Sequence, residues 1–168
     1  KAPEWELFKI VPPNYMYLRF SEKLDFSHAT FQVDEGIGKP ENIIIDSEGK
    51  SATLKFKNTF EKGVIYTIET GGLKDLAGNA LLKLTQETGI SENWEANDII
   101  INEVMFEQAE NSVEYVEIYN KSNKIINLKG LTLTTRKSIG DLNTGSKINN
   151  DILLAPQNYA ALCVDPDL

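Results

Sequence analysis

The sequence predicts an all-β fold made of two tandem β-sandwich domains. Short apolar or alternating runs recur along the 168 residues. Gly, Pro, Asn and Asp break these runs at intervals of about 8 to 12 residues, which is typical of a sandwich. No stretch shows a convincing apolar repeat at helical spacing, although residues 73–80 have room for one helical turn. Both observations favour short strands joined by turns.

The first domain is expected to span residues 1–90 and to contain six strands. Alternation is clearest at residues 15–20, where Met16, Leu18 and Phe20 fall on one face of a strand. We expect that face to lie in the core. The other expected strands are 4–11, 30–33, 43–46, 52–56 and 64–70.

A polar stretch separates the two domains. From about residue 85 to 97 the pattern lapses into Gln, Glu, Gly, Ser and Asn, with Trp94 as a lone aromatic. We interpret this stretch as linker and place the linker proper at residues 91–97. The second domain then spans 98–168, with strands expected at 98–106, 113–119, 125–133, 152–154 and 159–164.

Composition and charge exclude several classes of protein. The formal net charge of −8 argues against a nucleic-acid partner, because such binding depends on Lys and Arg contacts to phosphates. No apolar run approaches the ~18 residues of a membrane span. The single cysteine, Cys163, permits no internal disulfide and no Cys-rich zinc site, and we expect it to be a small buried hydrophobe. The chain opens at Lys1 without a leader, so a signal peptide is expected to be absent or already removed.

Catalytic machinery is not evident in the sequence. The only histidine, His28, is the one candidate base for a triad or a Cys–His pair, and we expect it on the surface or capping a loop. Phosphate-binding glycine loops do not occur. The sequence therefore predicts no catalytic residue and no organic cofactor.

One group of carboxylates leaves two interpretations open. Glu103, Glu114 and Glu117 fall in or beside two expected strands, where they either make structural hydrogen bonds or bind an ion such as Ca²⁺. Asp75 and Asn79 raise the same alternatives: a corner in which Asp75 caps a turn that Gly78 ends, or calcium ligation. The structural interpretation is favoured for both groups.

Two segments of the first domain carry a family resemblance. Residues 20–25 (FSEKLD) follow a strand, and residues 71–79 (GGLKDLAGN) come later in the same domain. Together they look like the bacterial Ig-like domains of surface-layer and other cell-surface proteins. The resemblance covers residues 4–88 and implies an Ig-like sandwich.

A second and more specific resemblance covers residues 98–164. The succession 99–104 (IIINEV), 114–120 (EYVEIYN) and 126–133 (INLKGLTL) resembles the lamin-tail domain, an Ig-like β-sandwich also found in bacterial secreted proteins. The chain departs from the family at Gln157, where a glycine is usual. The resemblance also implies further strands after residue 164, so we expect an open strand edge that pairs with another chain or segment.

Together the resemblances imply a bacterial extracytoplasmic protein, secreted or associated with the cell surface or outer membrane. The expected function is a non-catalytic binding or spacer module that contacts a protein, a glycan or adjacent domains, for example in adhesion. The alternative is a pair of accessory domains of a secreted hydrolase, such as a nuclease or phosphatase, whose catalytic domain lies outside this chain. A third hypothesis, that these residues are themselves an enzyme, is the least expected. If the ligand is a glycan, Trp5, Trp94 and Tyr119 are the aromatic candidates for its platform.

Overall fold

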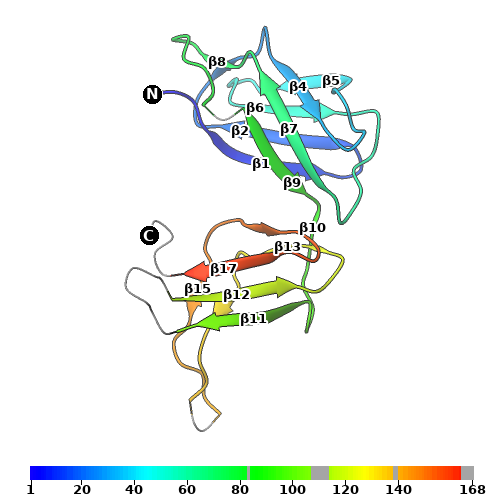
Figure 1. Ribbon diagram of the computed structural model, residues 1–168. Helices are drawn as coiled ribbons and strands as arrows, with labels where there is room; N and C mark the ends of the chain where they lie inside the picture. The colour runs from blue at the N-terminus through cyan, green and yellow to red at the C-terminus, as the bar shows by residue number, and fades with distance from the viewer. Residues whose placement is uncertain (83, 107–113, 138–139, 164–168) are drawn as a thin grey trace. The chain divides into compact units, whose positions relative to one another are not determined.

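The computed structural model describes residues 1–82, 84–106, 114–137 and 140–163, which form strands and turns (Figure 1). The chain divides into two compact units, Lys1–Ile90 and Ser91–Leu168. Within the described ranges there is no helix, and hence none with the length and apolarity needed to cross a bilayer. The predicted all-β class is confirmed.

Two sheets pack face to face in the first unit. One has the strand order β1 (Trp5–Val11), β2 (Tyr15–Phe20), β6 (Ser51–Lys55), β5 (Asn42–Ile45), and the other has the order β4 (Thr30–Val33), β7 (Ile65–Gly71), β9 (Thr85–Gly89). A short pair, β3 (Leu24–Asp25) and β8 (Lys74–Asp75), stands beside them. All neighbouring strands here run antiparallel, as an Ig-like sandwich requires.

The core of the first unit lies between these two sheets. Met16, Leu18 and Phe20 of β2 are completely buried, as their alternation predicted. Phe31 of β4 and Ile68 of β7 belong to the same cluster from the opposite sheet. The period-2 pattern therefore identified the core face directly.

Strand β9 lies in the polar stretch that we interpreted as linker. Residues Thr85–Gly89 pair antiparallel with β7, and only Thr88 among them is buried. A further short strand, β10 (Ser91–Glu92), pairs parallel with β13 (Ile125–Asn127) of the second unit. Backbone hydrogen bonds hold these strands in their sheets. Because their side chains do not alternate between apolar and polar, the sequence pattern did not identify them as strands.

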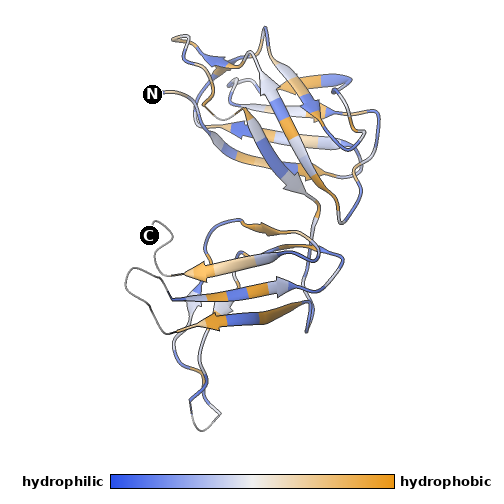
Figure 2. Ribbon diagram, viewed as in Figure 1, coloured by the Kyte–Doolittle hydropathy of each residue, from blue (hydrophilic) through white to orange (hydrophobic). Residues whose placement is uncertain are grey.

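The second unit also contains two three-stranded sheets. One has the order β11 (Ile99–Met105), β12 (Tyr115–Asn120), β17 (Tyr159–Cys163), and the other β10, β13, β16 (Leu153–Leu154). Strands β14 (Thr132–Leu133) and β15 (Ser146–Lys147) pair antiparallel as a separate two-stranded sheet. Orange and blue residues alternate along β12, the central strand of the first sheet (Figure 2). The cluster of buried residues here consists of Ile118, Ile126, Leu128 and Leu154.

Some expected strands of the second unit differ in extent. The run expected at 125–133 is two strands, because the chain turns at Gly130, whose φ is +90°. Val113 and Val164, the expected ends of two strands, lie outside the described residues. Residues 73–80 form β8 and a turn rather than a helical turn.

Candidate binding surface

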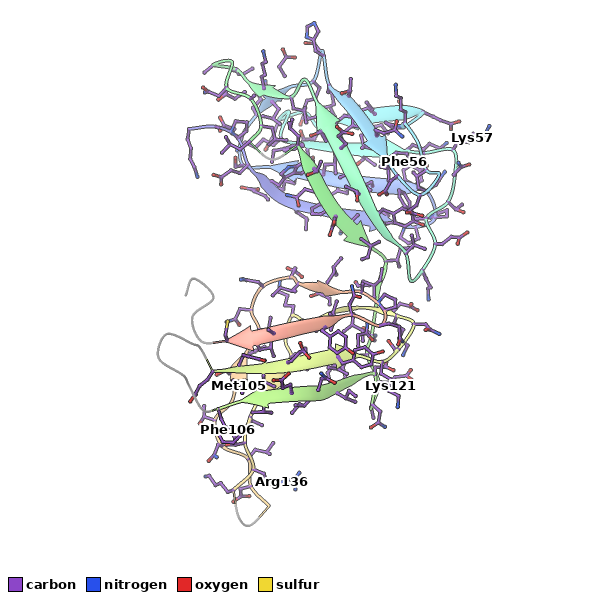
Figure 3. All side chains as sticks on the ribbon, in the orientation of Figure 1. Phe56, Lys57, Met105, Phe106, Lys121 and Arg136 are labelled. Carbon is purple, nitrogen blue, oxygen red and sulfur yellow. The ribbon has the colours of Figure 1, made fainter. Side chains whose placement is uncertain are left out.

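One face of the β11–β12–β17 sheet points away from the core of the second unit. Along β12, Ile118 and Asn120 are buried, so alternation turns Tyr115, Glu117 and Tyr119 to the opposite side. Their cross-strand partners on β11 and β17 share that side. We call this surface the outer face; its residues are Ile100, Glu103, Met105, Tyr115, Glu117, Tyr119, Tyr159, Ala161 and Cys163. Met105 marks its end on β11 in Figure 3.

An aromatic pair lies at the end of the outer face where β12 ends. Tyr119 and Tyr159 are direct cross-strand partners, and their rings stack with centroids 4.6 Å apart and an interplanar angle of 29°. Tyr159 is 53% exposed. Tyrosine supplies a large amphipathic contact area with little rotamer entropy to lose, so this pair is suited to binding.

Gln157 fixes the position of Tyr119 from the turn that precedes β17. The Tyr119 hydroxyl donates to Oε1 of Gln157, while Nε2 of Gln157 donates to the carbonyl oxygens of Lys121 (2.9 Å) and Ser122 (3.1 Å). Gln157 has a φ of +58°, a conformation that favours glycine. At this position, where the resemblance implies a glycine, a side chain bridges the turn to the aromatic pair.

Asn120 holds the same corner from inside the unit. Its side chain is completely buried, and its Nδ2 donates to the carbonyl oxygens of Lys124 (2.7 Å), Ala155 (3.0 Å) and Leu154 (3.1 Å). Its Oδ1 accepts from both the backbone N–H and the hydroxyl of Ser122. One amide therefore joins three segments of chain. An asparagine at the end of a strand is a common turn residue, so the sequence did not indicate that Asn120 would be buried and hold this corner together.

Two of the predicted carboxylates meet on the outer face. Glu103 and Glu117 are direct cross-strand partners. Each carboxylate has its own donor: Tyr115 donates its hydroxyl to Glu103 at 3.0 Å, and Asn102 donates its amide to Glu117 at 2.7 Å. Accepting that hydrogen bond, Glu103 raises the pKa of Tyr115, with desolvation and the charges of both carboxylates adding to the effect.

Glu114, the third predicted carboxylate, is not among the residues of the outer face. It is exposed and precedes β12, and no group of three or more His, Cys, Asp or Glu side chains that could hold a metal occurs within the described ranges. Asp75 accepts from the N–H groups of Ala77 and Asn79 and from the amide of Asn79. These are the hydrogen bonds of the structural interpretation, and the calcium alternative stays a prediction.

The three predicted aromatic candidates lie in different surroundings. Trp5 is half-buried and packs on Phe8 and Phe20, with ring centroids 5.9 and 4.8 Å apart, so it contributes to the first core. Trp94 is 52% exposed and borders a cavity of about 290 Å³ that Ile99 and Leu131 also line. Only Tyr119 belongs to the outer face.

His28 and Cys163 are both exposed. Nδ1 of His28 lies 2.9 Å from the hydroxyl of Ser27, and Asp25 accepts from the Ser27 backbone N–H rather than from the imidazole. This is not the order of a catalytic triad, in which the carboxylate orients the histidine. The expected burial of Cys163 is wrong, because alternation along β17 turns it to the outer face.

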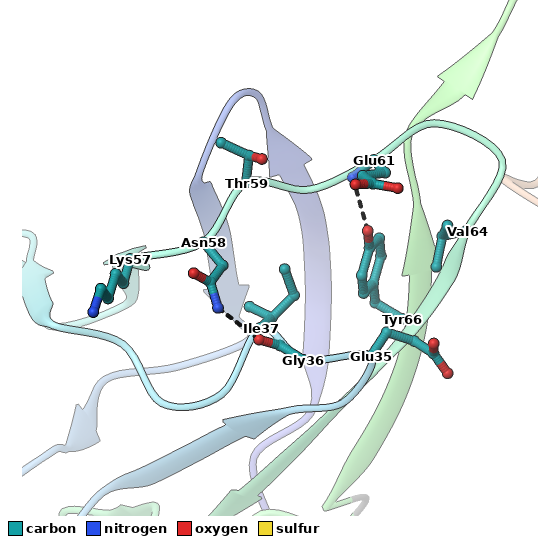
Figure 4. A pocket seen from close by; sticks show the side chains of 9 residues that line it. All are labelled: Glu35, Gly36, Ile37, Lys57, Asn58, Thr59, Glu61, Val64 and Tyr66. Carbon is teal, nitrogen blue, oxygen red and sulfur yellow. Dashed lines mark hydrogen bonds between the residues drawn. The ribbon is translucent and has the colours of Figure 1, made fainter.

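The loops of the first unit surround an open hollow of about 490 Å³ (Figure 4). Asn58 donates its amide to the carbonyl oxygen of Gly36 at 2.7 Å, and the Tyr66 hydroxyl accepts from the Glu61 N–H at 2.7 Å. These polar groups serve to hold the loops together. The outer face is therefore the better candidate surface.

Comparison with solved structures finds bacterial surface-layer proteins. The N-terminal part of the bacterial S-layer protein SbsC aligns over 100% of this chain and 42% of its own, with 18% identity and a TM-score of 0.48. The S-layer protein rSbsC(31-844) aligns over 97% of this chain and 24% of its own, with 17% identity and a TM-score of 0.47. The chain thus spans less than half of either structure.

No match was found among curated proteins. The family model of the lamin tail domain matches residues 93–166. That range contains all three strands of the outer face and the buried cluster behind it. The lamin-tail resemblance of the second unit, predicted from its sequence, is confirmed by this match.

Proposed function

We propose that the chain is a non-catalytic binding module of an extracytoplasmic protein, and that its outer face binds a protein partner. The observation that carries this proposal is the stacked pair Tyr119–Tyr159 on a sheet face that the described residues leave partly exposed. Tyr and Met are enriched at protein interfaces, and Met105 shares this face. The lamin-tail family supports the extracytoplasmic location through its occurrence in bacterial secreted proteins.

Charge indicates what kind of protein the partner is. Glu103 and Glu117 place two carboxylates side by side on the outer face, and the chain carries a formal net charge of −8. A basic partner surface would relieve the repulsion between these carboxylates and would be steered towards the chain at low ionic strength. We therefore expect the association rate to fall as salt is added.

Binding of the labelled chain to cells of the source organism tests this proposal. Binding should be lost after the cells are treated with protease and retained after periodate oxidation of their glycans. Tyr159→Ala and Glu103→Lys should each weaken binding at least tenfold. Leu82→Ala, at a 72% exposed position of the first unit, is the matched surface control and should bind like the wild type.

Other results would redirect the assignment. Loss of binding after periodate alone would identify a glycan ligand, and wild-type binding by both outer-face variants would rule out this surface. A chain that binds no treated or untreated cells would be a spacer. The accessory-domain alternative needs a catalytic domain outside these residues, and no feature of the described residues favours it.

A further inference from the structure

The strand β5 forms an open edge of the first unit. It is the last strand in the order β1-β2-β6-β5, and β6 is the one strand that pairs with it among the described residues. In an antiparallel pair, alternate residues of an edge strand turn their N–H and C=O groups away from the neighbouring strand. These groups can hydrogen-bond to a further strand. Figure 2 shows the edge at β5 in the orange of hydrophobic residues.

The side chains of β5 are unusual for such an edge. All four residues are exposed, including Ile43 at 36%, Ile44 at 56% and Ile45 at 43%. Edge strands normally carry a charge, a proline or a bulge that discourages pairing. Here Pro40 and Glu41 come before the strand, and none of these devices occurs within its antiparallel register with β6.

We infer that β5 pairs antiparallel with β5 of a second copy of this chain, joining the two four-stranded sheets into one. The sequence of the strand is self-complementary about Ile44. A two-fold axis at this residue sets Ile44 against Ile44, Ile43 against Ile45, and Asn42 against Asp46 of the second copy. Each isoleucine then meets an isoleucine, and no like charges face each other.

The surroundings of β5 leave room for this partner. Ile43 and Ile45 are cross-strand partners of the buried Leu54 and Ala52, so they lie on the core side of the sheet. On that side Ile45 borders an open hollow of about 500 Å³, to which Leu76, 73% exposed, also contributes. Ile43 of the second copy would lie beside Ile45 and cover this apolar surface.

The opposite side of the sheet carries the residue at the symmetry axis. Ile44 is the cross-strand partner of Thr53, which is only partly buried, and Ile44 is not part of the core cluster. A substitution of Ile44 should therefore change the pairing surface without disturbing the fold. Three side chains and one hollow bury less than the ~800 Å² per partner of a stable interface. We expect weak association, with a dissociation constant of roughly 0.1–1 mM.

Sedimentation of the full chain at about 0.02 to 1 mM, spanning the expected dissociation constant, tests the pairing. The wild type should shift from monomer to dimer across this range. Ile44→Lys and Ile44→Glu should each weaken self-association at least tenfold, because each places like charges against each other at the axis. An equimolar mixture of the two variants should regain a heterodimer, since Lys then faces Glu.

Two further variants test the edge and the register. Val11→Lys adds the same charge at a 40% exposed position of β1, at the other edge of the same sheet, and should dimerise like the wild type. In a Cys163→Ser background, Ile44→Cys should form a disulfide-linked dimer on mild oxidation, and Val11→Cys should not. A wild-type chain that stays monomeric at 1 mM, or a dimer that persists in Ile44→Lys, would overturn the inference. If the wild type dimerises but the mixture of Ile44→Lys and Ile44→Glu forms no heterodimer, the two-fold register is wrong.

Discussion

Replacing Asn120 by alanine should be among the most damaging single changes in the second unit. The amide is completely buried and makes five hydrogen-bond contacts: its two N–H groups are shared among three carbonyl oxygens, and its oxygen accepts twice from Ser122. A typical hydrogen bond contributes about 1 kcal/mol net, while a buried polar group left without a partner costs about 1–3 kcal/mol. Only the bond to Leu154 is fully buried, so water can replace part of the remainder.

We therefore expect Asn120→Ala to lower the free energy of unfolding by about 3 kcal/mol. A unit of this size has roughly 4–12 kcal/mol of stability in total. Ser122→Ala, which removes one hydroxyl from the same cluster, should cost only about 1 kcal/mol. Asn120→Asp is nearly isosteric, but at neutral pH it sets a carboxylate against three carbonyl oxygens, so it should be at least as destabilising as alanine.

Urea unfolding followed by native-state hydrogen exchange measures these differences. Amides of β12 and β13 should lose protection in Asn120→Ala, while those of β2 and β6 in the first unit serve as an internal reference. Equal costs for Asn120→Ala and Ser122→Ala, or a cost below about 1 kcal/mol for Asn120→Ala, would refute the role assigned to this amide.

Three other predictions concern single positions. Gly72→Ala should destabilise the first unit by about 2–4 kcal/mol in thermal unfolding. Gly72 has a φ of +72°, and an added Cβ would lie 2.0 Å from the carbonyl oxygen of His28. An unchanged melting temperature in this variant would contradict the prediction. Hydrogen bonds from Asn79 hold the pKa of Asp75 below its ordinary 3.8, so the stability contributed by this carboxylate is present above pH 3.8 and is lost as the pH falls through the lowered pKa. Asp75→Asn should flatten that acid dependence in unfolding curves, and an unchanged slope would show that other groups cause it. The exposed thiol of Cys163 should react with a maleimide in the folded protein at a rate within about tenfold of that in urea, and strong protection would place it in an interface.

Strands with apolar alternation could be predicted from sequence, whereas polar strands could not. The run at β2 was recognised because Met16, Leu18 and Phe20 alternate with residues that face the other way. Strand β9, with the sequence TQETG, contains no residue of high hydrophobicity, and its pairing with β7 depends on backbone hydrogen bonds. Such a strand is specified by its neighbour, so a local pattern carries no signal for it.

The candidate surface could be predicted only in part for a related reason. Alternation along β12 indicates that Glu117 and Tyr119 share a face. That Tyr159 stacks on Tyr119 depends on the register between β12 and β17, which lie far apart in the sequence. Register over such a separation is set by the fold as a whole, so the second ring of the pair had no local signal.

Strand β12 connects the stability of the second unit to its outer face. The residues that face inward, Ile118 and Asn120, alternate with those that face outward, and the backbone carbonyl of Asn120 accepts from the N–H of Gln157 at 2.9 Å. Gln157 in turn accepts from the hydroxyl of Tyr119. A change at Asn120 should therefore disturb both the fold and the aromatic pair, so lost binding in that variant would not identify a contact residue. Tyr159→Ala removes a half-exposed ring that stacks on Tyr119 outside the buried cluster. A loss of binding without a loss of stability in that variant would assign the contact to the outer face itself.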